Sequence, residues 1–481
     1  MKHRAFFTPA YPAAWLLFGM LFGLAAAYFL AASWSKTATA VIYTVPLVWV
    51  ALVAQHRPET LRGLNRIDIL FAVFILMVLT SLTVVQGGRK DIWKLLSYMP
   101  FMMLVPYVCG RFMRAADIDL FSRITLMAGI TILPLLLVDR YRSAGQEMVR
   151  WPFFGQDHGA LLVGALLATA LIALCVRALA CRNSGERNNR LNQLVRNGLI
   201  GVITVFLVWV TARGWLLAGL LGVMVVCWGA RDRAIVARGG LFAMVLGIAA
   251  LSLVSLPYLD PIFGSLYSMP LESLTIKSAG HDDAGEPLPM PLELPTIKDT
   301  KRDEARQSIS MPSELPTIKD AERDKARQPI LGQASCQPII EGVNSIAIRL
   351  VLYREAIAMF LENPVFGVGA ARFGEQSCVG VGLKSFPHST VLQAFAELGV
   401  IGGSLLVGLM ILAAISLVRR VMPSGANPNQ STDLFALALF VTFFVADQIY
   451  GNYFMSVGTW LMLGMVAGME AEDKDGGTQN V

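Results

Sequence analysis

The sequence predicts an all-α polytopic membrane protein, with about twelve transmembrane helices and one large loop outside the membrane. Of the 481 residues, 55% are hydrophobic and only 15% are charged, which is typical of a chain that spans a bilayer repeatedly. Apolar runs of roughly 20 residues, the length that crosses a hydrocarbon core of about 30 Å, recur along the chain. The charges gather between these runs and in one long interval.

Twelve apolar stretches are candidate spans. The first follows a basic N-terminus and resembles a signal peptide. Further spans follow at once and no small-residue cleavage site stands out, so we expect a retained anchor. An even number of spans places both termini on one side. The stretches cover residues 12–32, 37–54, 67–85, 93–111, 120–138, 159–180, 197–212, 214–230, 240–256, 391–418, 433–450 and 452–470.

The distribution of lysine and arginine predicts the orientation. With the N-terminus inside, the inner segments hold 17 of these residues, Arg111 and Arg420 among them, whereas the short outer segments hold 8. Such an excess marks the cytoplasmic side, so both termini are expected there. The net charge of +6 is then mostly a topology signal and requires no nucleic-acid partner.

The chain divides into four predicted parts: nine spans within 1–256, an outer loop over 257–390, three spans within 391–470 and a tail over 471–481. The loop contains a sequence repeat with a period of 21 residues between Met269 and Leu331. Its prolines, balanced charges and scarcity of large apolar residues predict a spacer that cannot bury enough surface to order itself.

Cysteine placement agrees with this orientation. Four cysteines lie toward the inner ends of spans, whereas Cys336 and Cys378 both lie in the outer loop. Because the exterior is oxidising, we expect these two to form a disulfide, with two unpaired thiols as the alternative. The inner cysteines are Cys109, Cys175, Cys181 and Cys227.

Arg213 is an unusual arginine. It stands at the tip of a hairpin between the seventh and eighth spans, with almost no loop to carry it away from the membrane. A charged side chain there is costly and tends to be retained for a partner or a polar cavity. We expect Arg213 to bind a ligand, with a lipid-phosphate anchor as the alternative; Gly214 allows a tight turn and close approach of a ligand.

A helix is predicted at 345–361, ended by Asn363 and Pro364 and followed by a glycine-rich turn of the form NPxxGxG. Its spacing places Arg349, Tyr353, Ala356 and Phe360 on one face. Such an amphipathic helix is expected to lie on the membrane surface and to direct Arg349 at whatever binds there. A plain surface arginine is the alternative.

His388 is the best candidate for a general base. It follows Pro387 and precedes the tenth span, and a neutral imidazole can accept a proton from a hydroxyl. Arg213 and Arg349 carry planar, permanently charged groups that suit phosphate oxygens. Together these residues indicate transfer of a group from a diphosphate to a hydroxyl.

The segments RLVLYREAIAMFLENPVFGVG and HSTVLQAFAELGVIGG resemble the signature region of the bacterial O-antigen ligase and polymerase superfamily. The TARG hairpin at Arg213 resembles a second motif of that superfamily. The match is dense from Arg349 to Gly403 and topological elsewhere, and the 21-residue repeats match nothing in the pattern.

The resemblance implies a membrane-embedded, inverting glycosyltransferase in the bacterial inner membrane. Its donor would be a glycan linked to undecaprenyl diphosphate, its acceptor a hydroxyl of lipid A-core, and its active site would face the periplasm. His388 would activate the hydroxyl while Arg213 and Arg349 hold the departing diphosphate. Glu397 would be a supporting or structural polar group. No cofactor is expected, and no metal, because the first outer loop lacks the acidic residues of metal-dependent relatives.

Some assignments stay open at this level. Ligase and polymerase share these motifs and differ in acceptor, although a single histidine with a helix-borne arginine favours the ligase. A transporter is the alternative from another class, but no repeat is found among the spans. Five further residues are possible substrate contacts or, alternatively, surface anchors: Arg89, Lys90, Arg142, His158 and Arg354.

Overall fold

The computed structural model describes residues 63–84, 99–142, 159–180, 190–210, 213–230, 237–252, 345–377, 386–422 and 430–477. Within these ranges the chain is helical and contains no strand, which agrees with the predicted all-α class. Ten of the twelve predicted spans coincide wholly or partly with these helices. The spans at 12–32 and 37–54 and the repeats at 269–331 lie outside the described residues.

The helices follow the apolar runs of the sequence and differ from the predicted ranges mainly at their ends. α8 begins seven residues before the predicted span, at Arg190. α16 continues to Gly477, well past the predicted end at 470. The elements are α3 (Arg66–Val84), a π-helical turn η3 (Pro100–Leu104), α5 (Val105–Arg111), α6 (Ala115–Arg142), α7 (Gly159–Ala180), α8 (Arg190–Trp209), α9 (Arg213–Gly229), a helix at Ala237–Ser252, α12 (Ser345–Glu362), α13 (Phe373–Gln376), α14 (Thr390–Val421), α15 (Gln430–Tyr450) and α16 (Val457–Gly477).

Four of the described helices are long and apolar enough to cross a bilayer: Ala115–Val138, Asn192–Trp209, Thr390–Val421 and Gln430–Tyr450. Three further apolar helices are shorter, at Val163–Leu179, Gly214–Gly229 and Ala237–Ser252. This supports a membrane protein with several spans. The number twelve stays a prediction.

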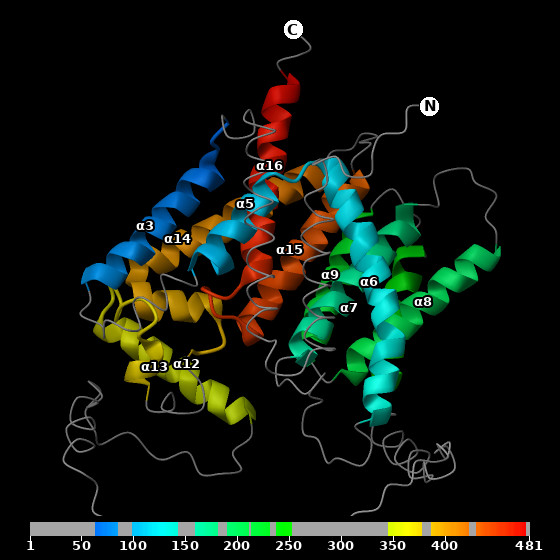
Figure 1. Cartoon of the computed structure of the whole chain (residues 1–481), viewed down its shortest axis with the longest axis horizontal. Coiled ribbons are helices and arrows are strands. Elements are labelled where there is room, and N and C mark those ends of the chain that lie inside the picture. Colours follow the sequence, from blue (N-terminus) through cyan, green and yellow to red (C-terminus); the bar gives the residue numbers. More distant parts are fainter. Residues whose placement is uncertain are drawn as a thin grey trace, which may run out of the picture.

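α15 lies near the centre of the bundle (Figure 1). It packs against α9, α14, α7 and α16, so it joins the helices on either side of it. α3, α12, α13 and most of α14 lie on one side in this view, and α6, α7, α8 and α9 lie on the other (Figure 1). Residues at the C-terminal end of α15 can therefore contact segments from both halves of the chain.

α16 packs against α5 at backbone distance. Gly110 of α5 and Gly464 of α16 allow this approach, because a Cβ at Gly464 would overlap the carbonyl oxygen of Tyr107 and one at Gly110 would overlap that of Leu461. Small residues at such crossings are a common means of packing helices in membranes.

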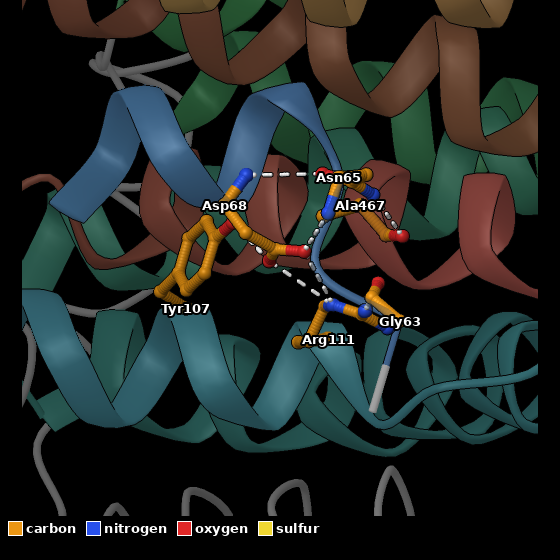
Figure 2. A network of polar contacts seen from close by, with 6 residues as sticks. All are labelled: Gly63, Asn65, Asp68, Tyr107, Arg111 and Ala467. Atoms are coloured by element: carbon orange, nitrogen blue, oxygen red, sulfur yellow. Dashed lines mark hydrogen bonds and ion pairs between the residues drawn. The ribbon is translucent and has the colours of Figure 1, made fainter. Parts of the chain in front are cut away.

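A buried ionic network joins α3, α5 and α16 (Figure 2). The Arg111 Nε donates to both carboxylate oxygens of Asp68, at 3.0 and 3.2 Å, and the two side chains are only 8% and 7% exposed. The Tyr107 hydroxyl donates to the same carboxylate at 2.8 Å, and Asn65 Nδ2 donates to the carbonyl of Ala467 at 2.8 Å. The network fixes three helices relative to one another.

Two of the cations counted above as inner-surface charges are therefore partners inside the protein. Arg111 is buried against Asp68, and Arg420 lies 3.5 Å from the Asp433 carboxylate while donating to the carbonyl of Met469. Acidic partners on neighbouring helices hold both side chains in the bundle. Leaving both out keeps most of the predicted excess.

The Asp68 network generates a stability prediction. Asp68→Ala leaves the Arg111 guanidinium buried without its carboxylate, and breaking a buried pair in this way costs about 3 to 5 kcal/mol. We expect a large fall in the thermal unfolding midpoint of the purified protein in detergent. Arg123→Ala is the control, because its ion pair with Asp119 is 63% and 43% exposed and should contribute little. Equal midpoints for the two variants would contradict the assigned role of the network.

Candidate active site

The glycine-rich turn after α12 lies directly on a break in α14. The Val368 amide donates to the carbonyl of Ala396 and the Gly369 amide to that of Glu397, both at 2.9 Å. In the reverse direction the Val400 amide donates to the carbonyl of Pro364 at 2.7 Å. The NPxxGxG and ELG motifs, some thirty residues apart, thus form one unit of paired backbone.

Two glycines make this pairing possible. Gly367 has φ +70° and Gly399 has φ +66°, a conformation that other residues rarely adopt. A Cβ at Gly367 would overlap the backbone of Glu397, and one at Gly399 would overlap that of Val365. At Gly399 the backbone leaves helical geometry, which interrupts α14 within the predicted span 391–418.

Glu397 anchors the rest of the turn. Its fully buried carboxylate accepts hydrogen bonds from the Ala371 amide at 2.8 Å and the Phe373 amide at 3.3 Å. The Tyr453 hydroxyl at 2.7 Å and the side-chain amide of Gln393 at 3.1 Å complete the set of donors. Glu397 therefore holds the backbone of the turn in place through its hydrogen bonds with the two backbone amides.

α12 packs on this unit through Leu352, Ala356 and Met359, which contact Phe373 and Ala396 among others. Of the four residues predicted to share one face of α12, Ala356 is buried and the other three are partly buried. The buried face of α12 packs against α14. Arg349 and Tyr353 flank the buried face and Arg354 is exposed.

His388 lies just before α14 in a strained conformation. Its φ is +58°, and its ring stacks edge-on against Phe386 at 4.5 Å between centroids. Ser389 follows as the N-cap of α14, where its hydroxyl accepts from the Leu392 amide at 3.4 Å. Both ring nitrogens of His388 are shielded from solvent.

Gln448, near the end of α15, contacts the residues that follow His388. The Ser389 hydroxyl donates to Gln448 Oε1 at 3.0 Å, and Gln448 Nε2 donates to the Thr390 hydroxyl at 2.7 Å. The main-chain carbonyl of Gln448 accepts from the Tyr353 hydroxyl at 3.5 Å. One residue therefore contacts both the start of α14 and α12.

Tyr450, two residues further on, joins Arg349 to the start of α9. The guanidinium carbon of Arg349 lies 5.6 Å from the centroid of the Tyr450 ring, within the range of a cation–π contact. The Tyr450 hydroxyl accepts from the Gly214 amide at 2.7 Å. A Cβ at Gly214 would overlap the Tyr450 ring. The absence of a side chain at Gly214 therefore allows the Tyr450 ring to approach, whereas the sequence suggested the approach of a ligand.

The segments that hold three of the predicted site residues contact the same turn of α15. His388, Arg349 and the first residue of α9, Arg213, all lie at segments that contact the last turn of α15. The Nε of Arg349 is buried, and no residue of the described ranges accepts a hydrogen bond from it. A buried arginine with an unused donor is suited to binding an oxyanion.

The remaining candidates are less informative. Arg142 is the last residue of α6, on a different element from the turn described above. No group of three or more His, Cys, Asp or Glu able to hold a metal occurs in the described ranges. Arg89, Lys90, His158, Cys336 and Cys378 lie outside the described residues, so their roles and the disulfide stay predictions.

Sequence reasoning missed Gln448, Tyr450 and Tyr453. They belong to the segment ADQIYGNYF, where polar and aromatic residues replace an apolar run at the end of a span. Polar residues at such a position are costly and often functional, and this signal could have identified them.

Comparison with known families is consistent with this geometry. The described residues form an all-helical bundle with several helices long and apolar enough to cross a bilayer, which is the architecture of a multi-pass membrane protein. Residues 198–407 match the family model described as O-antigen ligase, the superfamily that the motifs of the sequence resemble. The matched region includes Arg213, Arg349, His388 and Glu397. No curated protein matches the chain.

The paired turn generates a prediction for the two glycines. Alanine at positive φ costs about 1 to 2 kcal/mol before any overlap is counted. We therefore expect Gly367→Ala and Gly399→Ala to lower the unfolding midpoint and to increase proteolysis between Asn363 and Ser377. Gly247→Ala is the matched control, because a Cβ at this helical glycine meets open space. If all three variants had the unfolding midpoint and the proteolysis rate of the parent protein, the two glycines would not be required for the paired turn.

Glu397 provides an independent test of the same unit. In Glu397→Gln one acceptor oxygen becomes an NH₂ group, which faces the donors of the turn and leaves at least one of them unpaired, at a cost of about 1 to 3 kcal/mol. Amide hydrogen exchange of the peptide that contains Ala371 and Phe373 should accelerate, while peptides of α6 stay unchanged. Unaltered exchange in that turn would show that Glu397 does not hold it.

Proposed function

We propose that the protein is an O-antigen ligase of the bacterial inner membrane. It transfers a glycan from undecaprenyl diphosphate to a hydroxyl of lipid A-core, with inversion and without a metal or cofactor. The active site faces the periplasm, and both termini are cytoplasmic. The observation that supports this most is that the residues after His388, Arg349 and the start of α9 all contact the end of α15.

In this proposal the acceptor hydroxyl gives its proton to His388. The hydroxyl oxygen then attacks the anomeric carbon of the donor sugar from the side opposite the diphosphate. The bond between that carbon and the phosphate oxygen breaks, and the diphosphate leaves with both electrons. A histidine can serve as base at ambient pH because its ordinary pKa lies near neutrality.

Arg349 and Arg213 would stabilise the charge that accumulates on the leaving diphosphate. The buried and unused Nε of Arg349 supports this role, because a donor held in place needs no reorganisation when charge develops. The Tyr450 ring holds the guanidinium from one side. Glu397 acts at a distance in this scheme, since it fixes the turn that α12 packs against.

The activity test uses the purified protein with a glycan on undecaprenyl diphosphate and lipid A-core, in EDTA and without nucleotide. We expect glycosylated lipid A, and we expect His388→Ala, Arg349→Ala and Arg213→Ala each to lower the rate by about 100-fold or more, the effect of removing one stabilising group. Arg123→Ala, which removes an exposed arginine of α6, should leave the rate unchanged.

Other outcomes would contradict the proposal. If the donor glycan becomes longer, the protein is a polymerase and not a ligase. A donor that is bound but unchanged would favour a transporter. Full activity in both His388→Ala and Arg213→Ala would show that the site is assigned wrongly.

A further inference from the structure

Gln448 occupies an unusual position relative to His388. His388 is one of only two non-glycine residues in the described ranges with a positive φ, the other being Ala371 in the turn held by Glu397. Non-glycine residues persist in that conformation only where the surroundings determine it. At Ala371 the surroundings are a carboxylate that binds its amide, so an equivalent constraint is expected beside His388.

The amide of Gln448 supplies such a constraint. Its oxygen accepts from the Ser389 hydroxyl at 3.0 Å and from the Val391 amide at 3.4 Å, while its nitrogen donates to the Thr390 hydroxyl at 2.7 Å. The three residues after His388 are thus all bound by one side chain. Pro387, which is buried and has a restricted φ, limits the chain on the other side.

The same residue contacts the helix that bears Arg349. The Gln448 carbonyl accepts from the hydroxyl of Tyr353, one turn along α12 from Arg349. Gln448 therefore bridges the segment of the proposed base and the helix of the proposed diphosphate clamp. Thr442, another polar residue of α15, bonds only to carbonyls of Ala438 and Ala218 and has no such contact within the described part of the chain.

We propose that Gln448 is a positioning residue, which holds His388 in its left-handed conformation so that the imidazole faces the reacting hydroxyl. Only the expected effect of Gln448 on catalysis rests on the proposed function. The conformational part depends on the hydrogen bonds of Gln448 and can be tested without any substrate. Loss of the amide should release the segment and let His388 relax to negative φ, which moves its ring.

The first test measures the reactivity of His388 directly. The full chain in lipid nanodiscs is treated with diethyl pyrocarbonate, and modification of each histidine is followed by mass spectrometry of its peptide. The His388 nitrogens are shielded in the structure, so we expect slow modification in the parent protein and several-fold faster modification in Gln448→Leu. The other histidines serve as internal references, and Thr442→Val is the matched control.

The second test separates positioning from general stability. In the transfer assay Gln448→Leu should lower kcat by about 100-fold, the effect of displacing a catalytic group by about 1 Å, while KM for the donor changes little. Combining it with Ser389→Ala and Thr390→Val should add almost no further loss, because the same contacts are already gone. If Gln448→Leu fails to insert, Gln448→Asn replaces it, since this variant keeps the polar amide and shortens its reach.

The outcomes distinguish the two proposals. Faster modification of His388 together with reduced kcat supports the positioning role. An unchanged modification rate with an unchanged kcat overturns it, and so does an equal effect in Thr442→Val. If the parent protein transfers no glycan, the proposed function fails, and the modification rate alone still decides whether Gln448 holds His388.

Discussion

The pairing of the turn after α12 with the break in α14 is the constraint on which the site depends. Three backbone hydrogen bonds and the carboxylate of Glu397 join segments that two glycines allow to touch. Because α12 packs on this unit, the position of Arg349 relative to the start of α14 follows from it. The glycine-rich turn therefore helps to determine where Arg349 lies.

The last turn of α15 completes the arrangement. Gln448 contacts the start of α14 and Tyr450 contacts both Arg349 and the start of α9. α15 is also the helix that packs against both sides of the bundle (Figure 1). A central and rigid helix is a suitable support for groups that must keep their mutual distances during a reaction.

Much of the fold could be predicted from the sequence, because apolar runs report helices directly. The motifs around Asn363, His388 and Glu397 also stood out, as polar or glycine-rich interruptions of such runs. Their contact with one another could not be derived, since it depends on how distant segments pack. For the same reason the ion pair of Arg111 with Asp68 could not be predicted, because the two residues are 43 positions apart.

The contacts that could not be predicted join residues far apart in the sequence. Tyr450 meets Gly214 across 236 residues, and Gln448 meets Ser389 across 59. In neither pair does the local sequence around one residue indicate which residue it contacts. A glutamine and a tyrosine at the end of an apolar span are a weak signal alone, and only the packing of α15 shows what they contact.

The central claim is that one site at the end of α15 binds the diphosphate of a lipid-linked glycan beside His388. The most direct measurement is an experimental structure of the protein in lipid nanodiscs with an undecaprenyl diphosphate-linked donor. The account predicts density for the diphosphate within hydrogen-bond distance of Arg349 and Arg213, with the first sugar next to His388. A diphosphate bound away from these residues, in an otherwise unchanged fold, would contradict the account.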